Sequence, residues 1–391
     1  MNIIGGACAV GLGVAFLVSC GARSGLGLFD DGRADAGDGA KGGVVLAPGD
    51  AHNGRAAGTG GRATGAGGVA GAGISATGGA APASAGTAGV SGSLPSGPTA
   101  AWEVVMHTPS PGGFQGPSGF YESVWSDSAT RAWITSETDL AAGSLLRWEN
   151  GAVSVERDGC RSRVFTVRGR AASDLWSAGC DTALLHRSGP SWSTVSAPRS
   201  TWVWENSPND LWVCCDTASS DAGAVPVASN WDGSAWRGVS LPSMGYQGGN
   251  LWSGAAHDLW IATADILHWD GAVWTTFNDP SRRNWRSVWG VGTTVWAAGT
   301  GGRVARIRDG SFESFATEAL LPEGMELEGV WGRSVDDVWF VGLHGAILHW
   351  NGTTLVRDSA GIETNFTDVW GADNTLWIVG HEETLVRRRL N

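Results

Sequence analysis

A repeat built on a pair of tryptophans, complete in six copies, occurs seven times along this 391-residue chain, and this recurrence limits the possible fold more than any other feature. The second tryptophan of each pair follows a hydrophobic residue, and successive copies lie 36 to 48 residues apart. These second tryptophans are Trp133, Trp176, Trp212, Trp260, Trp296, Trp339 and Trp377. In six copies the first tryptophan lies seven or eight residues earlier, and in the second copy Phe165 takes its place. Such a period is typical of folds that repeat one supersecondary unit.

Each unit consists of four short β-patterned runs separated by turn residues. In the sixth copy these runs lie near Gly329–Gly332, Val338–Val341, Ala346–Trp350 and Thr354–Arg357. Asp-Gly or Asn-Gly between the third and fourth runs supplies the left-handed residues of a tight hairpin, and no run is long enough for a helix. Four antiparallel strands repeated seven times predict an all-β fold, a seven-bladed β-propeller.

The two ends of the repeat region are expected to pair with each other. The last copy stops at "TLVRRRLN", which matches only a third strand, while "AWEVV" at 101–105 matches the fourth strands of other copies. We therefore predict that the N-terminal strand completes the seventh blade beside the C-terminal strand and removes two exposed sheet edges.

The N-terminus predicts export and a lipid anchor. Residues 1–19 form an uncharged apolar segment, and the run Leu17-Val18-Ser19-Cys20 resembles a bacterial lipobox. The resemblance implies cleavage before Cys20 and acyl chains on this residue, which attach the chain to the membrane by lipid alone. Gly21 in place of an aspartate favours the outer membrane. The alternative is an ordinary cleaved signal peptide.

A flexible tether is expected between the anchor and the repeats. Residues 20–101 are rich in Gly, Ala, Ser and Thr, show no apolar periodicity and contain none of the 23 tryptophans. Such a segment buries too little apolar surface to offset its ordering entropy. The expected domains are thus the signal peptide (1–19), the tether (20–101) and the propeller (102–391).

The repeat units also resemble a known group of proteins. Their "VWG…DVWxVGxxGxILHWDG" pattern is similar to that of Trp-rich β-propeller lipoproteins, which are abundant in gliding and predatory soil bacteria. The likeness is more distant to the Asp-box repeats of sialidase-like propellers and to tectonin-type repeats. It covers about residues 102–391 and implies the propeller fold, whereas the fold hosts many activities and implies none.

The aromatic and histidine positions are interpreted as scaffold. Tryptophans at equivalent strand positions are expected to pack between blades, while Trp285, outside the repeat frame, is expected to be exposed. One repeat position accepts different polar residues and is expected to be a solvated outer-strand site; its occupants are Arg147, His186, Ser229, His268, Arg306, His349 and Arg387. No histidine pair has metal-ligand spacing, and we expect neither a metal nor a cofactor.

Four cysteines remain outside the N-terminal segment. Cys160 precedes the first strand of the second blade and Cys180 follows its second strand, so both lie at one face of the ring. Cys214 and Cys215 end the second strand of the next blade at that same face. In an exported chain we predict the disulfides Cys160–Cys180 and Cys214–Cys215, with cross-pairing between the blades as the alternative.

The longest insertions extend from that same face, and loops on a rigid scaffold commonly carry recognition. The ligand contacts expected there are stacking and cationic groups in these insertions, namely Tyr246, Arg282, Arg283 and Trp285.

The composition limits the function. The net charge of −12 argues against a nucleic-acid binder. With two tyrosines and no phosphate loop or Ser/His/Asp motif, we expect a non-enzymatic, monomeric envelope lipoprotein that binds a protein or a glycan. The alternatives are a glycan-active hydrolase or lyase of the sialidase-like type and an outer-membrane assembly factor. Arginines and carboxylates clustered at the channel mouth would favour the enzyme.

Overall fold

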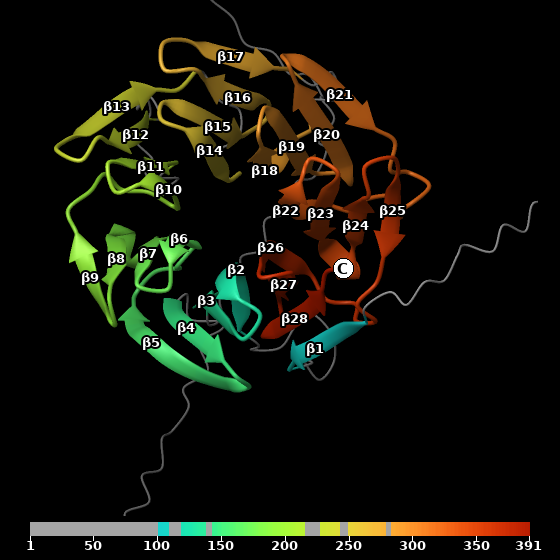
Figure 1. The fold of residues 1–391 in the computed structure, drawn as a ribbon, viewed down its shortest axis with the longest axis horizontal. Coiled ribbons are helices and arrows are strands. Elements are labelled where there is room, and N and C mark those ends of the chain that lie inside the picture. Colours follow the sequence, from blue (N-terminus) through green and yellow to red (C-terminus); the bar gives the residue numbers. More distant parts are fainter. Residues whose placement is uncertain (1–100, 109–118, 138–142, 216–226, 243–248, 279–282) are drawn as a thin grey trace, which may run out of the picture. The chain divides into compact units, whose positions relative to one another are not determined.

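The computed structural model describes residues 101–108, 119–137, 143–215, 227–242, 249–278 and 283–391. These residues form seven four-stranded antiparallel sheets arranged as the blades of one ring (Figure 1). The fold is the predicted seven-bladed β-propeller.

Each blade runs from an inner strand at the centre of the ring to an outer strand at its rim. Blade one consists of β2 (Phe120–Ser128), β3 (Arg131–Glu137), β4 (Gly143–Glu149) and β5 (Ala152–Cys160). Blade two consists of β6 (Thr166–Ala171), β7 (Asp174–Ala178), β8 (Leu184–Ser188) and β9 (Ser191–Val195). Blade three consists of β10 (Trp202–Ser207), β11 (Asp210–Cys214), β12 (Val227–Trp231) and β13 (Trp236–Ser240). Blade four consists of β14 (Leu251–Ala255), β15 (Asp258–Ala262), β16 (Ile266–Trp269) and β17 (Trp274–Phe277).

The remaining blades follow the same order. Blade five consists of β18 (Trp285–Val291), β19 (Thr294–Gly299), β20 (Arg303–Arg308) and β21 (Ser311–Phe315). Blade six consists of β22 (Leu327–Ser334), β23 (Asp337–Gly342), β24 (Ile347–Trp350) and β25 (Leu355–Asp358). Blade seven consists of β26 (Phe366–Ala372), β27 (Thr375–Gly380), β28 (Thr384–Arg389) and the N-terminal β1 (Trp102–Met106).

The N- and C-terminal strands close the ring as predicted. Strand β1 pairs antiparallel with β28, with Trp102 opposite Arg388 and Val104 opposite Val386. An ion pair of 2.8 Å between Glu103 and Arg387 joins the same two strands. The seventh blade is therefore assembled from both ends of the propeller. Strand β28 pairs on both sides, and β1 is the outer strand of the blade.

The two tryptophans of a repeat face each other across the first strand pair, as Trp125 does with Trp133 and Trp289 does with Trp296. In blade two, however, the residue opposite Trp176 is Arg168. The expectation that Phe165 replaces the missing tryptophan is therefore wrong. Arg168 occupies the position, because register rather than aromatic character fixes which residue points there.

The inner-strand tryptophans meet at the centre of the ring. Trp289 in blade five lies 5.4 Å from Trp370 in blade seven and 5.5 Å from Trp204 in blade three, measured between ring centroids. These blades are not neighbours, so the contacts cross the centre. Trp125, Trp252 and Trp331 join the same cluster through neighbouring rings. The first tryptophan of each pair thus fills the channel, a role beyond the expected packing between adjacent blades.

The glycine of the "VWG" motif makes room for this cluster. A β-carbon on Gly371 would overlap the ring of Trp331 from the preceding blade, and one on Gly290 would overlap the ring of Trp252. The indole N–H groups fix the same arrangement, because Trp289 Nε1 donates to the Gly332 carbonyl of the next blade at 3.0 Å.

Arg168 is held in the tryptophan cluster by charge. Its guanidinium lies 5.1 Å from the Trp370 ring and 3.1 Å from the Asp368 carboxylate, and both charged side chains are almost fully buried. Asp368 also accepts hydrogen bonds from Ser123 Oγ (2.8 Å) and Val124 N (3.0 Å). Pairing and hydrogen bonding satisfy the buried charges, which would otherwise be costly in such surroundings.

Both predicted disulfides are present. Cys160 at the end of β5 bonds to Cys180 after β7, with the two Cα atoms 5.0 Å apart, and Cys214 bonds to Cys215 at the end of β11. We call the side of the ring that carries them, where the inner strands begin, the disulfide face, and the opposite side the turn face. In the part of the chain that the structure describes, no helix has the length and apolarity required to cross a membrane.

The packing of the centre predicts the effect of a single methyl group. Gly371→Ala is expected to lower the free energy of unfolding by about 1–3 kcal/mol, because the Trp331 indole must move out of a close-packed cluster. Gly238→Ala is the matched control, since its β-carbon would meet only the half-exposed side chain of Val227. Urea unfolding monitored by circular dichroism measures both; equal effects would contradict the packing.

Candidate functional site: a cleft between blades four and five

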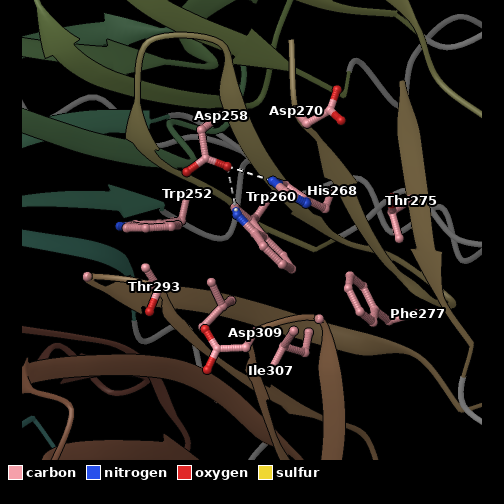
Figure 2. Close-up of a pocket in the computed structure, with 13 residues that line it drawn as sticks. Trp252, Asp258, Trp260, His268, Asp270, Thr275, Phe277, Thr293, Ile307 and Asp309 are labelled. Atoms are coloured by element: carbon pink, nitrogen blue, oxygen red, sulfur yellow. Dashed lines mark hydrogen bonds and ion pairs between the residues drawn. The ribbon is translucent and has the colours of Figure 1, made fainter. Parts of the chain in front are cut away.

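A cleft of about 550 Å³ opens at the turn face between blades four and five. Residues from all four strands of blade four form one wall (Figure 2). The first and last hairpin turns of blade five, together with Val295 and Ile307, form the other. The described lining residues are Trp252, Asp258, Trp260, His268, Asp270, Thr275, Phe277, Gly292, Thr293, Val295, Ile307, Asp309 and Gly310.

Aromatic and aliphatic groups line the body of the cleft. Trp260 lies at its middle in Figure 2, with Phe277 at one end and Trp252 at the other. The rings of Trp260 and Phe277 are nearly parallel, with centroids 5.6 Å apart. Ile307 of blade five faces Trp260. Flat aromatic surface in a concavity suits a ligand with an apolar or planar part.

Trp260 is fixed by an aspartate and a histidine. Asp258 Oδ1 accepts hydrogen bonds from Trp260 Nε1 (3.0 Å) and interacts with His268 Nε2 (2.7 Å), while the imidazole stacks on the indole at 3.9 Å. Figure 2 shows both interactions as dashed lines. We call this arrangement the Asp–Trp–His trio.

The trio recurs in full in blade six, where Asp337 accepts from Trp339 Nε1 and interacts with His349 at 2.8 Å. Blade two has the Asp174–His186 interaction, also 2.8 Å, and the stacking of His186 on Trp176, but the Trp176 N–H does not bond to Asp174. Burial alone would raise the pKa of both aspartates, but the hydrogen bonds from their histidines and the nearby arginines outweigh it and lower each pKa below its usual value.

The expectation of a solvated site at the histidine position is therefore wrong. These imidazoles are partly buried against tryptophan, and where arginine replaces histidine its guanidinium also lies over the indole, as Arg306 does over Trp296 at 5.3 Å. In blade three the residue opposite Trp212 is Asn230 rather than Ser229. The position recurs because it covers one face of the second tryptophan.

Carboxylates surround the mouth of the cleft. Besides Asp258, Asp270 and Asp309 lie on its rim, and none of the described lining residues is arginine or lysine. Asp270 directly follows β16 and accepts hydrogen bonds from the backbone N–H groups of Val273 and Ala272, which lower its pKa. Asp309 lies in a left-handed turn, with φ of 50°. The site thus combines an aromatic body with an acidic rim.

The structure describes two of the four residues that the sequence predicted as ligand contacts. Tyr246 and Arg282 lie outside the described residues. Arg283 is exposed on the disulfide face. Trp285 is completely buried, with the Arg303 guanidinium 4.3 Å from its ring, so the expectation of an exposed ring is wrong. The cleft lies at the other face, and no sequence signal marks it, because the "DLW…HW" pattern of blade four recurs as "DVW…HW" in blade six.

The mouth of the channel at the disulfide face carries arginines and carboxylates. Arg286 of blade five pairs with Glu326 (2.9 Å) and Glu328 (3.6 Å) of blade six, and Arg163 pairs with Glu122 and Glu137 of blade one. Burial raises the pKa of Glu328 to about 7, against the opposing effect of Arg286. Within the described residues no group of three or more His, Cys, Asp or Glu side chains could hold a metal ion.

Comparison with known proteins identifies the fold. No family model and no curated protein matches the chain. Among solved structures, virginiamycin B lyase from Staphylococcus aureus aligns with a TM-score of 0.59 at 13% identity over 74% of this chain and 99% of its own.

Two further structures align equally well. YCF48 bound to D1 peptide gives 0.56 at 14% identity over 75% of this chain and 100% of its own, and the WD40 repeats of RRP9 give 0.56 at 12% identity over 75% and 99%. At such identities the likeness shows a shared β-propeller fold.

Proposed function

We propose that the protein is a non-enzymatic lipoprotein of the outer membrane, whose propeller binds a protein or a glycan through the cleft between blades four and five. The observation that carries the proposal is the cleft itself, in which Trp260 and Phe277 form an aromatic body beneath the acidic rim. Rigid strands position its walls, so a ligand would meet a preformed surface and lose little affinity to ordering of the site. The sequence features at Cys20 support the lipid anchor.

The structural neighbours are compatible with such a role. One of them, YCF48, is described as bound to a peptide, and others are WD40 domains. This likeness supports a binding scaffold without indicating its ligand, because propellers of very different sequence share this architecture.

Filling the cleft is expected to abolish partner binding. Ile307→Arg places a long side chain in the cleft. The equivalent residue of blade seven is already an arginine, Arg388, so the fold accepts arginine at this position. Full-length wild type should recover a protein or glycan partner from an envelope extract, and the variant should recover at least about tenfold less. Val155→Arg is the control, since it adds the same charge at a 60% exposed position of β5. Partner recovery that is unaffected by Ile307→Arg would refute the assignment of this cleft, provided that the variant unfolds at the wild-type temperature.

The anchor has its own test. Cys20→Ser removes the thiol that the lipobox would acylate, so the chain is expected to leave the membrane fraction on cell fractionation. If the variant still sediments with membranes after a high-salt wash, anchoring by this cysteine is disproved.

A glycan-active hydrolase or lyase is the second candidate, and the channel mouth is the observation in its favour. A partly buried carboxyl group with a pKa near neutrality, such as that of Glu328, is suited to proton transfer. However, Arg286 and Arg163 each join carboxylates of a neighbouring blade, which equally serves to hold inner strands together. We therefore favour the binding role.

The raised pKa of Glu328 predicts a pH dependence of stability. The folded chain holds this proton up to about pH 7, whereas the unfolded chain releases it near the ordinary pKa of 4.5. The stabilisation is thus present below pH 4.5 and is lost as pH rises to 7, by the order of 2 kcal/mol. Glu328→Gln should remove this component from urea unfolding curves measured at pH 5 and 7.5.

Glu313→Gln is the matched control, because Glu313 is half exposed and pairs with Arg306 on the outer surface of blade five. If both variants show the wild-type pH dependence of the unfolding free energy, the raised pKa of Glu328 is not its cause.

A further inference from the structure

Three blade junctions contain an Asp–His interaction with the imidazole stacked on the second tryptophan, and they differ in the residue that approaches this tryptophan from the next blade. This residue is set by register, since in each case it lies opposite the residue before the second tryptophan of its own blade. It is Trp231 after blade two, Ile307 after blade four and Arg388 after blade six. Comparing these junctions shows what the cleft lacks.

In the junction of blades six and seven an arginine covers the tryptophan. The Arg388 guanidinium lies 5.1 Å from the Trp339 ring, is largely buried and pairs with Asp358. In the junction of blades two and three, Trp231 belongs to the same apolar cluster as Trp176. At the corresponding position of blade five, Ile307 is shorter than Arg388 or Trp231. It leaves the cleft open in front of Trp260.

A second arginine is also missing from blade four. In blades two and six, Arg170 and Arg333 pair with the remaining oxygen of the trio aspartate, Oδ2, at 2.8 and 2.7 Å. The equivalent residue of blade four is Gly254, where any side chain would overlap the Trp252 ring. No donor from the described residues reaches Asp258 Oδ2.

The cleft therefore lacks both positive charges found at the junction of blades six and seven, Arg333 on the trio aspartate and Arg388 over the tryptophan ring. We propose that it binds the guanidinium group of an arginine side chain from a partner protein, placed over Trp260 as Arg388 is over Trp339. Asp258 and the rim carboxylates of Asp270 and Asp309 would accept its hydrogen bonds. A guanidinium combines a planar face for the indole with a fork of donors for carboxylates, which an ammonium or a sugar hydroxyl does not. This inference rests on the proposed binding function and names its ligand.

The probe is the tripeptide acetyl-Gly-Arg-Gly-amide, titrated into the full-length protein by isothermal calorimetry at low salt. Its citrulline analogue keeps the planar shape but carries no charge and has a carbonyl oxygen in place of one NH2 donor group. The arginine peptide is expected to bind with a dissociation constant in the millimolar range, as a single side chain would, and the citrulline peptide at least about tenfold more weakly. Raising the salt concentration should weaken the arginine peptide alone.

Variants with precedents in this chain locate the binding. Asp270→Asn and Asp309→Asn together remove two rim charges, and both turns accept asparagine, because Asn351 forms the same turn hydrogen bonds in blade six and Asn150 the same left-handed turn in blade one. The double variant should bind the arginine peptide about three- to tenfold more weakly. Asp232→Asn, at the Asp270 position of blade three, should have no effect. Ile307→Arg should abolish binding by supplying the guanidinium internally.

The outcomes separate this inference from the proposed function. Equal binding of both peptides, or arginine binding that survives Ile307→Arg, overturns the arginine site. If Ile307→Arg instead abolishes binding of an oligosaccharide such as chitohexaose while the arginine peptide never binds, the binding function stands and the arginine inference fails. If neither the peptide nor the extract partner depends on the cleft, both fail.

Discussion

Contact among six indole rings at the centre of the ring is the interaction on which the rest of the structure depends. Each buried tryptophan removes about 150–250 Å² from water, an upper estimate of about 4–6 kcal/mol per side chain. Because these rings touch one another across the centre, none of the six inner strands that carry them can move outward without opening the cluster. The "VWG" glycines and the indole hydrogen bonds to neighbouring carbonyls follow from this packing.

In the seventh inner strand an arginine, Arg168, takes the tryptophan position, and it distinguishes blade two from the other six blades. Arg168 can lie in the cluster only beside Asp368, which belongs to the blade on the other side of blade one. Six equivalent tryptophans would allow a blade to pack at several positions in the ring. A buried ion pair between two particular blades specifies one order of blades. The pair thus favours correct closure of blades seven, one and two, next to the seam formed by β1 and β28.

The sequence predicted those features that depend on spacing and strand direction. The number of blades, the closing strand at 101–105 and the placement of four cysteines at one face all follow from counting strands around a ring. The sequence-based predictions were wrong where strand register determines the direction in which a side chain points. Phe165 resembled the missing tryptophan, but Arg168 holds its place, and Trp285 was expected outside the packed frame, although β18 begins with it.

The candidate site was missed because it results from what one junction lacks. The "DLW" and "HW" segments of blade four differ little from those of blade six, and both repeats appear equivalent in the sequence. Only the placement of Ile307 and Gly254 against Trp260 and Asp258 shows that this junction has no internal arginine. The long insertions of the disulfide face were the predicted site instead. Two of the residues predicted there, Tyr246 and Arg282, lie outside the described residues.

A double-mutant cycle between Trp289 and Trp370 tests the central cluster most directly. These residues come from non-adjacent blades and donate their indole hydrogen bonds to different carbonyls, so their only direct interaction is the ring contact of 5.4 Å. With each replaced by phenylalanine, singly and together, the unfolding free energies should show a coupling of about 0.5–1.5 kcal/mol. Effects that add to within about 0.3 kcal/mol would contradict a closed ring packed around its tryptophans.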